Sequence, residues 1–279
     1  MKAADPSTDP FQKELDACIA NGSPAQKLRG KRAFVTGCTS GIGLAVTIDL
    51  LREGLNVTGV GRRATRLAAL HDFSQKQGFL GKFDSICADC TKPEFFAALK
   101  TQTAALESEI LICNAGLARG LDPVASSATS DWHEMISTNV TAVFELVRLF
   151  LPEMIRAQRG TIIGLGSIAG HVPYENGSVY CATKHAVRAF FGALRQETCG
   201  QNIRVSLVSP GMVQTGFSEV RFKGDTKRAQ AVYAGVDALS AQDISQIMLQ
   251  ILKAPPHVNI DDIVVMPVQQ GSVFKVARK

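Results

Sequence analysis

The sequence lacks the features that mark membrane, secreted and nucleic-acid-binding proteins. No uninterrupted apolar run reaches the roughly 20 residues that cross a bilayer, and residues 1–10 carry early acids and no apolar core, unlike a secretory signal. Lysine and arginine form no long run, and the net charge of the 279 residues is only +5. These absences exclude the usual footprints of nucleic-acid and membrane partners and favour a cytoplasmic enzyme.

The cysteines do not follow the spacing of a disulfide framework or a zinc site. The seven cysteines are scattered and odd in number, which argues for a reducing compartment rather than a disulfide framework. Cys87 and Cys90 form a C-x-x-C pair, but a zinc site needs a second pair of ligands at matching spacing, and the sequence contains none. The histidines do not cluster with acids or cysteines either. We therefore expect no metal site and interpret Cys87 and Cys90 as packing at the end of a strand.

What the chain does contain is a regular alternation of strand and helix patterns. Short apolar runs predict strands at 32–36, 55–60, 83–88, 109–113, 161–166, 203–208 and 263–266. Helical patterns lie between them, including a long one at 131–157 with a break or junction at Pro152. Such alternation indicates an α/β fold with a parallel sheet covered by helices on both faces. Residues 29–279 form one predicted domain, and residues 1–28 are either a small docking helix or a disordered arm.

A glycine-rich turn follows the first predicted strand. Its glycines let backbone amides approach a pyrophosphate, which then lies at the positive end of the following helix. The spacing is Gly-x-x-x-Gly-x-Gly, and its position directly after the first strand is what makes the turn informative. The residues expected to contact a dinucleotide here are Gly37, Thr39, Ser40, Gly41, Ile42 and Gly43.

Two arginines at the end of the second predicted strand indicate which dinucleotide the chain binds. Sites selective for NAD place an acid here to bind the ribose 2′-hydroxyl, but this chain has Arg62 and Arg63. Two guanidinium groups suit a 2′-phosphate, whereas an acid would repel it. We therefore expect NADP(H); a solvated helix start is the alternative, although arginine opposes the helix dipole there. Asp89 and Cys90 follow the third strand and are expected near the adenine, with Asp89 equally well explained as a helix cap.

The turns after the fourth and sixth predicted strands add candidates for cofactor contact. Asn114 and Gly116 follow strand four and can place an amide and bare backbone against a ribose. Backbone groups after strand six can meet a nicotinamide carboxamide, and the candidates there are Pro210, Gly211, Val213 and Thr215. Taken alone, each turn is equally well explained as a plain connection.

Tyr180 and Lys184 stand four residues apart in a predicted helix and therefore share one face of it. A phenol has an ordinary pKa of about 10, too high for proton transfer at neutral pH, and we expect the lysine ammonium to lower this pKa. Ser167 ends the fifth predicted strand, where its hydroxyl can donate to a substrate oxygen. The three side chains suit the interconversion of a carbonyl and an alcohol. A half-buried tyrosine beside a solvated lysine is the plain structural alternative.

The segment 214–239 lies between the sixth strand and the last predicted helix, and we expect it to cover the active site as a lid. Its basic residues suit an anionic substrate. Arg221 is the best candidate for binding a carboxylate or sulfonate, because its fork matches either group; the alternative is a solvated basic loop. His171 and Tyr174 follow Ser167 and should line the substrate pocket, with His171 contributing shape or a hydrogen bond rather than acid–base chemistry.

With these motifs assembled, the chain from about residue 30 onward resembles the short-chain dehydrogenase/reductase family. The motifs that carry the resemblance are Thr36-Gly-x-x-x-Gly-x-Gly43, Asn114-Ala-Gly116, Asn139, Ser167, Tyr180-x-x-x-Lys184 and Pro210-Gly211. The resemblance implies a single-domain Rossmann fold, usually a homotetramer, with a catalytic tetrad of Asn139, Ser167, Tyr180 and Lys184. In that set Tyr180 and Lys184 also contact the cofactor, and Asn139 holds a water through its helix backbone. Cys113 replaces an asparagine that is more usual in the family, which should not affect catalysis.

A narrower resemblance concerns the substrate. Gly61-Arg-Arg and the segments 167–174, 220–225 and 257–268 resemble the bacterial NADP-dependent 3-hydroxy acid dehydrogenases. Those enzymes interconvert serine, L-allo-threonine or 3-hydroxypropionate-type acids and the matching semialdehydes, and sulfoacetaldehyde reductases share most of the pattern. The resemblance implies a small anionic hydroxy acid or aldehyde as substrate, and a homotetramer or homodimer as assembly. The alternatives are a sulfoacetaldehyde reductase, a broader carbonyl reductase and a non-catalytic NADP-binding protein.

Overall fold

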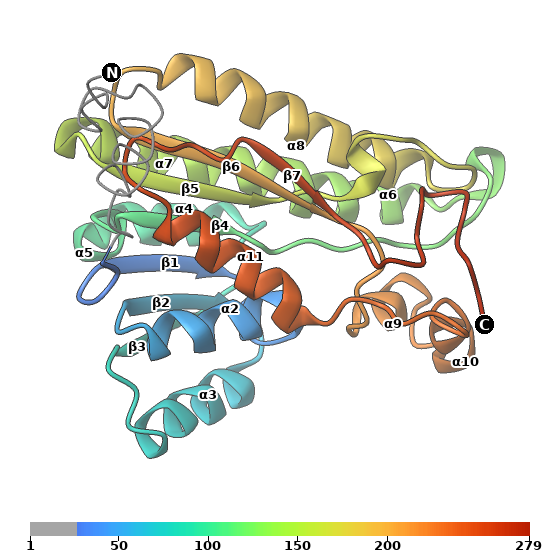
Figure 1. Cartoon of the computed structure of the whole chain (residues 1–279), viewed down its shortest axis with the longest axis horizontal. Helices are drawn as coiled ribbons and strands as arrows, with labels where there is room; N and C mark the ends of the chain where they lie inside the picture. The colour runs from blue at the N-terminus through green and yellow to red at the C-terminus, as the bar shows by residue number, and fades with distance from the viewer. Residues whose placement is uncertain (1–26) are drawn as a thin grey trace, which may run out of the picture.

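Seven parallel strands form one sheet in the order β3-β2-β1-β4-β5-β6-β7 (Figure 1). The computed structural model describes residues 27–279, so residues 1–26, most of the predicted N-terminal extension, lie outside the described residues. The strands are β1 (Arg32–Thr36), β2 (Asn56–Gly61), β3 (Phe83–Cys87), β4 (Ile110–Cys113), β5 (Gly160–Leu165), β6 (Ile203–Pro210) and β7 (Asp262–Val265). All seven predicted strands are present, and the predicted fold class is confirmed.

Helices cover both faces of the sheet because its central strands are apolar on both sides. Phe34 packs into one core, with α4 (Pro93–Thr101), α5 (Thr103–Leu106), α7 (Ala142–Ala157) and α8 (Ser178–Glu197). The next residue, Val35, packs into the other core, with α2 (Gly41–Arg52), α3 (Ala64–Lys76) and α11 (Ala241–Lys253). Successive side chains of a strand point to opposite faces, so this single strand joins the two layers.

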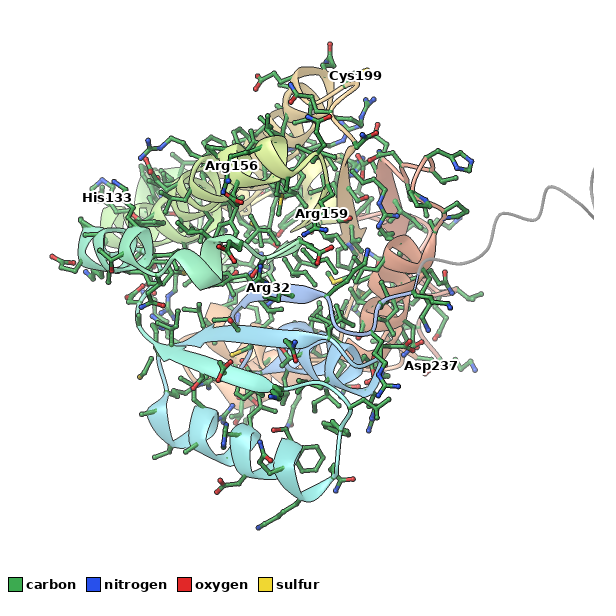
Figure 2. All side chains as sticks on the ribbon, turned by 90° about the vertical axis from the view of Figure 1, so that its left-hand side faces the viewer. Arg32, His133, Arg156, Arg159, Cys199 and Asp237 are labelled. Carbon is green, nitrogen blue, oxygen red and sulfur yellow. The ribbon has the colours of Figure 1, made fainter. Side chains whose placement is uncertain are left out.

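The strand order reverses between β1 and β4, and in such sheets ligands bind at the carboxyl ends of the strands beside the reversal. Figure 2 faces the other edge, where Arg32 and Arg159 mark the starts of β1 and β5. A cavity of about 460 Å³ opens on that side, beside Arg32, Asn56 and Asp84. None of the predicted site residues lines this cavity.

The long predicted helix at 131–157 is divided, but not where expected. It consists of α6 (Thr129–Ile136), a π turn labelled η3 (Ser137–Thr141) and α7. Pro152 lies inside α7, so the predicted break there is wrong. A proline removes one main-chain donor, but Pro152 is exposed, and the carbonyl that loses its partner can bind water.

The apolar residues of the helical segment Thr129–Ala157 contribute to the hydrophobic core. By length and composition alone, Thr129–Ala157 would be able to cross a bilayer. However, one side of α7, including Val143, Leu146 and Phe150, is buried against the sheet. Charged residues such as Glu145 and Arg148 form ion pairs on its outer surface. This is the packing of a core helix of a globular domain.

Candidate active site

The turn between β1 and α2 has a conformation that only glycine permits at two positions. Gly37 has a φ of +71°, and a Cβ atom on Gly43 would lie 2.2 Å from the Gly37 carbonyl oxygen. The amide of Asn114, after β4, donates to the Thr36 carbonyl oxygen at 2.8 Å and braces the turn. The bare backbone at the start of α2 is therefore open to a phosphate group.

Two other predicted cofactor segments approach the same edge of the sheet. Thr215, after β6, lies against the glycine-rich turn, since a Cβ atom on Gly41 would be 3.4 Å from the Thr215 Cβ atom. A Cβ atom on Gly116 would lie 3.3 Å from Asn139 Oδ1 and 3.6 Å from Lys184 Nζ. The structure thus brings the turns after β1, β4 and β6 together with two of the predicted catalytic residues.

The arginines after β2 form a basic cluster beside the glycine-rich turn. Arg63 Nη2 donates to Thr39 Oγ1 and Ser40 Oγ, each at 2.9 Å. Arg66 Nη1 donates to the Thr39 carbonyl oxygen at 3.3 Å. Burial and the charges of Arg66 and Arg62 lower the pKa of Arg63. Within residues 27–279 no ion pair joins any of the three arginines to an acid, so their charge is available to a ligand.

Three other residues predicted to contact the cofactor, Asp89, Cys90 and Gly211, make contacts with other parts of the protein. The Asp89 carboxylate accepts from the Thr91 main-chain N–H at 3.0 Å and from its hydroxyl at 2.8 Å, and Lys92, not Asp89, caps α4. Cys90 packs into the core, whereas Cys87 is exposed. The main chain of Gly211 donates to the Val265 carbonyl oxygen at 2.7 Å, which continues the pairing of β6 with β7.

Ser167, Tyr180 and Lys184 lie together at the carboxyl end of β5. Ser167 is the N-cap of the short 3-10 helix η4 (Ile168–Gly170), where its hydroxyl accepts from the Ala169 main-chain N–H at 3.1 Å, and it lies close enough to Tyr180 to act on the pKa of the phenol. Lys184 Nζ donates to the Leu165 carbonyl oxygen at 2.8 Å and is 5.9 Å from the centroid of the Tyr180 ring. Both Tyr180 and Lys184 are buried in the first half of α8. The plain alternative of a solvated lysine is therefore wrong.

The electrostatics of Tyr180 differ from the expectation. Burial raises the pKa of Tyr180 to about 12, although the charge of Arg221 and the nearby Ser167 hydroxyl act to lower it. Burial also lowers the pKa of Lys184 to about 8. The expected lowering of the Tyr180 pKa by Lys184 stays a prediction. The Lys184 amine is bonded to a main-chain oxygen of β5, and Arg221 is a second cation beside the phenol.

Asn139 lies in the π turn and connects α8 to the loop after β4. Its Oδ1 accepts from the Leu117 main-chain N–H at 2.8 Å, and its Nδ2 donates to the Leu117 carbonyl oxygen at 2.8 Å. The same Nδ2 donates to Thr183 Oγ1 at 3.1 Å. The side chain is therefore fully engaged, and the expected contact with a water through the helix backbone stays a prediction.

Arg221 ends the short helix α9 (Phe217–Arg221) in the predicted lid segment, which also contains α10 (Thr226–Ala231). Its Nη2 donates to the Tyr174 hydroxyl at 2.7 Å, and its guanidinium carbon lies 4.9 Å from the centroid of the Tyr180 ring. Its Nε is buried without a hydrogen-bond partner. The guanidinium group thus has a donor to spare beside the predicted proton-transfer group.

His171 lies apart from this pair. Its Nε2 is 3.5 Å from Asp262 Oδ1 on β7 and has no hydrogen bond. Burial lowers the pKa of His171, although the charge of Asp262 acts to raise it. Across the described chain, no hydrogen bond joins His171 to Tyr174, Tyr180 or Arg221. Its expected place in the wall of the substrate pocket stays a prediction.

Comparison with known proteins identifies the family. A family model described as short chain dehydrogenase matches residues 31–226. This chain belongs to the short-chain dehydrogenase family. The family resemblance of the sequence is therefore confirmed, and with it the expectation of an oxidoreductase.

Relatives of this short-chain dehydrogenase cover nearly its whole length. It is 42% identical to the "Probable NADP-dependent dehydrogenase" of Haemophilus influenzae, over 86% of this chain and 94% of that protein. It is 38% identical to the "NADP-dependent 3-hydroxy acid dehydrogenase" of Salmonella typhi, over 85% of this chain and 95% of the relative. It resembles the solved closed form of serine dehydrogenase complexed with NADP+, with a TM-score of 0.80 and 36% identity, over 89% of this chain and 100% of the other. The expectation of NADP is confirmed at the level of these relatives.

Two sets of residues in this short-chain dehydrogenase were missed from the sequence. Arg66 belongs to the basic cluster, and its spacing of three from Arg63 on a helix was the available signal. Arg119 pairs with Glu134 beside the lid, with Nε to Oε2 at 2.7 Å and Nη2 to Oε1 at 2.8 Å. No local pattern marks that pair, because its partners lie on different elements.

Proposed function

We propose that this short-chain dehydrogenase is NADP(H)-dependent and interconverts a small anionic 3-hydroxy acid and its semialdehyde or ketone. The substrates would be of the serine, L-allo-threonine or 3-hydroxypropionate type. The observation that carries the proposal is the placement of Arg221, whose guanidinium group has a buried, unpartnered Nε beside Tyr180. A buried donor of this kind is costly unless a ligand satisfies it, and a carboxylate is the group that a guanidinium binds best.

The residues around the glycine-rich turn fit the cofactor. The pyrophosphate would be held by the main chain of the turn at 37–43, whose close packing leaves no room for a Cβ atom on Gly43. The 2′-phosphate would be held by Arg62, Arg63 and Arg66. Further contacts are assigned to the main chain or side chains of Asp89, Cys90, Asn114, Gly116, Pro210, Gly211, Val213 and Thr215. When bound, NADP(H) supplies or accepts the hydride at the carbon that bears the reacting oxygen.

The proton moves at the hydroxyl of Tyr180. Tyr180 gives a proton to the carbonyl oxygen in reduction and takes it from the alcohol in oxidation. Ser167, whose hydroxyl lies near Tyr180, holds and polarises the same oxygen. Lys184 holds the cofactor ribose, and Asn139 is assigned the family's water-binding role in the proton relay. Tyr174, hydrogen-bonded to Arg221, completes the anion site, and His171, which lies apart from this pair, is assigned to the wall of the substrate pocket.

The proposal is tested by NADP+ reduction with L-serine, L-allo-threonine, 3-hydroxypropionate, isethionate and an uncharged secondary alcohol. We expect a clear preference for the carboxylates. In Arg221→Ala, KM for the preferred acid should rise about tenfold or more, while kcat/KM for the uncharged alcohol stays within about threefold after correction for any shift in its pH profile. Lys227→Ala, which removes an exposed charge from the same segment, should change neither value.

Other results would redirect the proposal. A preference for isethionate would assign the protein to the sulfoacetaldehyde reductases, since a sulfonate suits the same guanidinium group. Activity on the uncharged alcohol alone would indicate a broader carbonyl reductase. Tight NADP+ binding with no turnover on any substrate would indicate a non-catalytic protein. The proposal includes a cytoplasmic location and a homotetramer or homodimer, the usual assembly of the family, which sedimentation velocity would test.

A further inference from the structure

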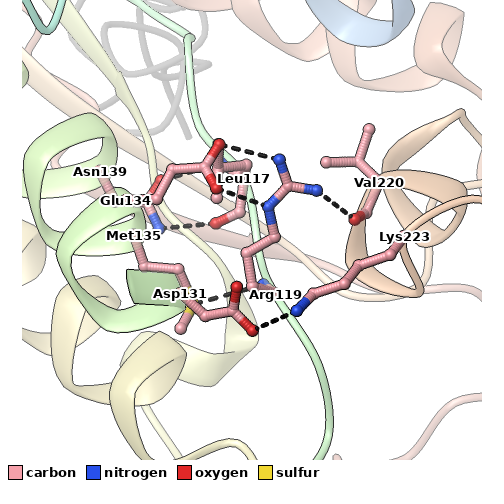
Figure 3. Close-up of polar contacts among 8 residues, drawn as sticks. All are labelled: Leu117, Arg119, Asp131, Glu134, Met135, Asn139, Val220 and Lys223. Atoms are coloured by element: carbon pink, nitrogen blue, oxygen red, sulfur yellow. Dashed lines mark hydrogen bonds and ion pairs between the residues drawn. The ribbon is translucent and has the colours of Figure 1, made fainter. Parts of the chain in front are cut away.

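The last turn of α9, which carries Arg221, is anchored to the opposite wall of the site (Figure 3). Arg119 Nη1 donates to the Val220 carbonyl oxygen at 2.8 Å. The next main-chain N–H, that of Gly120, donates to the Arg221 carbonyl oxygen at 2.8 Å. Two consecutive carbonyls of α9 are therefore held by two consecutive residues of the loop after β4. A carbonyl at the end of a helix has no partner within it, so such bonds fix the position of the helix end.

Arg119 is itself held in place by α6. Its Nε and Nη2 form a two-point ion pair with the carboxylate of Glu134, at 2.7 and 2.8 Å, and its main-chain N–H donates to Met135 Sδ at 3.4 Å. The hydrogen bond raises the pKa of Arg119 and lowers that of Glu134. A two-point Arg–carboxylate pair fixes orientation as well as distance. All three side-chain nitrogens of Arg119 thus have protein partners, which hold its guanidinium group in place.

A second ion pair anchors the residues just beyond α9. Lys223 Nζ lies 2.8 Å from Asp131 Oδ2 at the start of α6, and the Asp131 carboxylate is largely shielded (Figure 3). Lys223 has a φ of +54°, a conformation that a side chain other than glycine rarely adopts without support. The two ion pairs therefore connect α6 to the chain on both sides of Arg221. One acts through Arg119, which binds the Val220 carbonyl oxygen, and the other acts directly through Lys223.

The same loop leads directly to the proton-transfer residues. Asn139 binds both main-chain polar groups of Leu117, two residues before Arg119. The loop 117–120 is thus held at one end by the π turn and α6 and binds α9 at its other end (Figure 3). This loop therefore connects the end of α9, which carries Arg221, to Asn139 and, through Asn139, to α8.

We propose that Arg119 and Glu134 are positioning residues for the anionic substrate. They hold the end of α9 so that the guanidinium group of Arg221 lies over Tyr180, and they thereby set the affinity for the substrate's charged group. The inference rests on the proposed function, because it takes Arg221 as the residue that binds this group. It adds that two residues with no contact to the substrate determine specificity for the anion.

The test is the variant Glu134→Gln, which keeps the size of the side chain but removes the charge and one acceptor. KM for 3-hydroxypropionate should rise about tenfold, while kcat stays within about threefold and kcat/KM for an uncharged secondary alcohol is nearly unchanged. The Kd for NADP+, measured by calorimetry, should not move. Glu145→Gln is the matched control, since it breaks an Arg–Glu pair with Arg148 on the outer surface of α7 and should leave all four values unchanged.

The double variant Glu134→Gln/Arg221→Ala separates this inference from the proposed function. If Glu134 acts through Arg221, its replacement should have little further effect on KM once Arg221 is absent. An equal tenfold rise in both backgrounds would overturn the positioning role and leave the proposed function intact. An Arg221→Ala protein with an unchanged KM for the acid would instead overturn the proposed function.

Two further results test the inference if Glu134→Gln does not fold, or if it affects charged and uncharged substrates equally. If circular dichroism shows that it is not folded, Lys223→Met tests the second anchor and should raise the same KM with kcat retained. A Lys223→Met protein with wild-type KM would then contradict the inference. Equal losses on charged and uncharged substrates in folded Glu134→Gln, measured on the pH plateau where Tyr180 is in its active form, would also contradict it, because a pair that positions Arg221 for an anion should affect the charged substrate more than the uncharged one.

Discussion

The guanidinium carbon of Arg221 lies 4.9 Å from the centroid of the Tyr180 ring, closer than the 5.9 Å that separates Lys184 Nζ from the same centroid. One side chain therefore faces both the proposed anion site and the proton-transfer group. A cation near a phenol favours the phenolate and opposes the effect of burial. Substrate binding and acid–base chemistry are thus coupled through Arg221 in the proposed mechanism.

Replacing Arg221 should consequently change the pH dependence of the reaction. Oxidation needs Tyr180 as a base, so its rate rises with pH through the apparent pKa of this group. In Arg221→Met the loss of the cation should move this profile toward higher pH and lower the rate on its acidic side by about 3- to 10-fold. The measurement is kcat/KM against pH with an uncharged secondary alcohol, which avoids the loss of carboxylate binding. A profile that stays in place would contradict the coupling.

The basic cluster after β2 should control the choice of dinucleotide. Arg63→Ala removes the guanidinium group that contacts Thr39 and Ser40, and it should weaken NADP+ binding by about 10- to 100-fold. Binding of NAD+, which lacks the 2′-phosphate, should change by less than about threefold. Calorimetric Kd values for both dinucleotides give the ratio, and Lys76→Ala at the far end of α3 is the control. Equal losses for the two dinucleotides would mean that Arg63 supports the turn and does not read the phosphate.

The sequence predicted those parts of the fold and site that depend on local patterns. Each buried parallel strand reads as a short apolar run, and the glycine-rich turn follows β1 because the phosphate cradle requires it there. The Ser240 and Asp243 side chains form a capping box at the start of α11, a motif that follows from their spacing of three residues. The break expected at Pro152 failed because an exposed proline costs one hydrogen bond that water can replace, whereas the π turn at Ser137–Thr141 has no local signature.

Contacts between distant elements were beyond the sequence. Arg119 and Val220 are 101 residues apart, and nothing in either segment marks the other. The position of Arg221 over Tyr180 likewise depends on how the lid segment returns to the sheet. The spacing of Tyr180 and Lys184 did place them on one helix face. It did not reveal that Lys184 would bind the end of β5 or that Arg221 would lie over the phenol.

Gly43 should not tolerate a side chain. Its Cβ atom would lie 2.2 Å from the Gly37 carbonyl oxygen and 2.3 Å from Asn114 Nδ2, so Gly43→Ala must displace the turn or α2. We expect a loss of about 2 kcal/mol or more in the free energy of unfolding and weaker NADP+ binding. Gly192→Ala, inside α8 with nothing within 4 Å, should instead stabilise the protein by about 0.5–1 kcal/mol. Equal unfolding midpoints in urea for the two variants would show that the turn is not as tightly packed as described.

The buried amine of Lys184 should make stability depend on pH in a defined window. Its pKa is lowered by burial from 10.5 to about 8, so between these values the unfolded chain keeps a proton that the folded chain has released. The contribution of Lys184 to the free energy of unfolding therefore rises with pH from about 8 to 10.5, and its penalty is complete below pH 8.

Lys184→Met removes the charge and keeps the length of the side chain, so it should stabilise the protein by about 1 kcal/mol or more at pH 7. The gap to the wild-type protein should narrow at pH 10. Urea unfolding of both proteins at the two pH values measures it. Buried thiols such as Cys38 and Cys113, whose pKa values burial raises, change stability in the opposite direction over the same window. They are common to both proteins and cancel in the difference. A gap that is the same at both pH values would show that Lys184 keeps its ordinary pKa in the fold, and its proposed partnership with Tyr180 would then have to involve the charged amine.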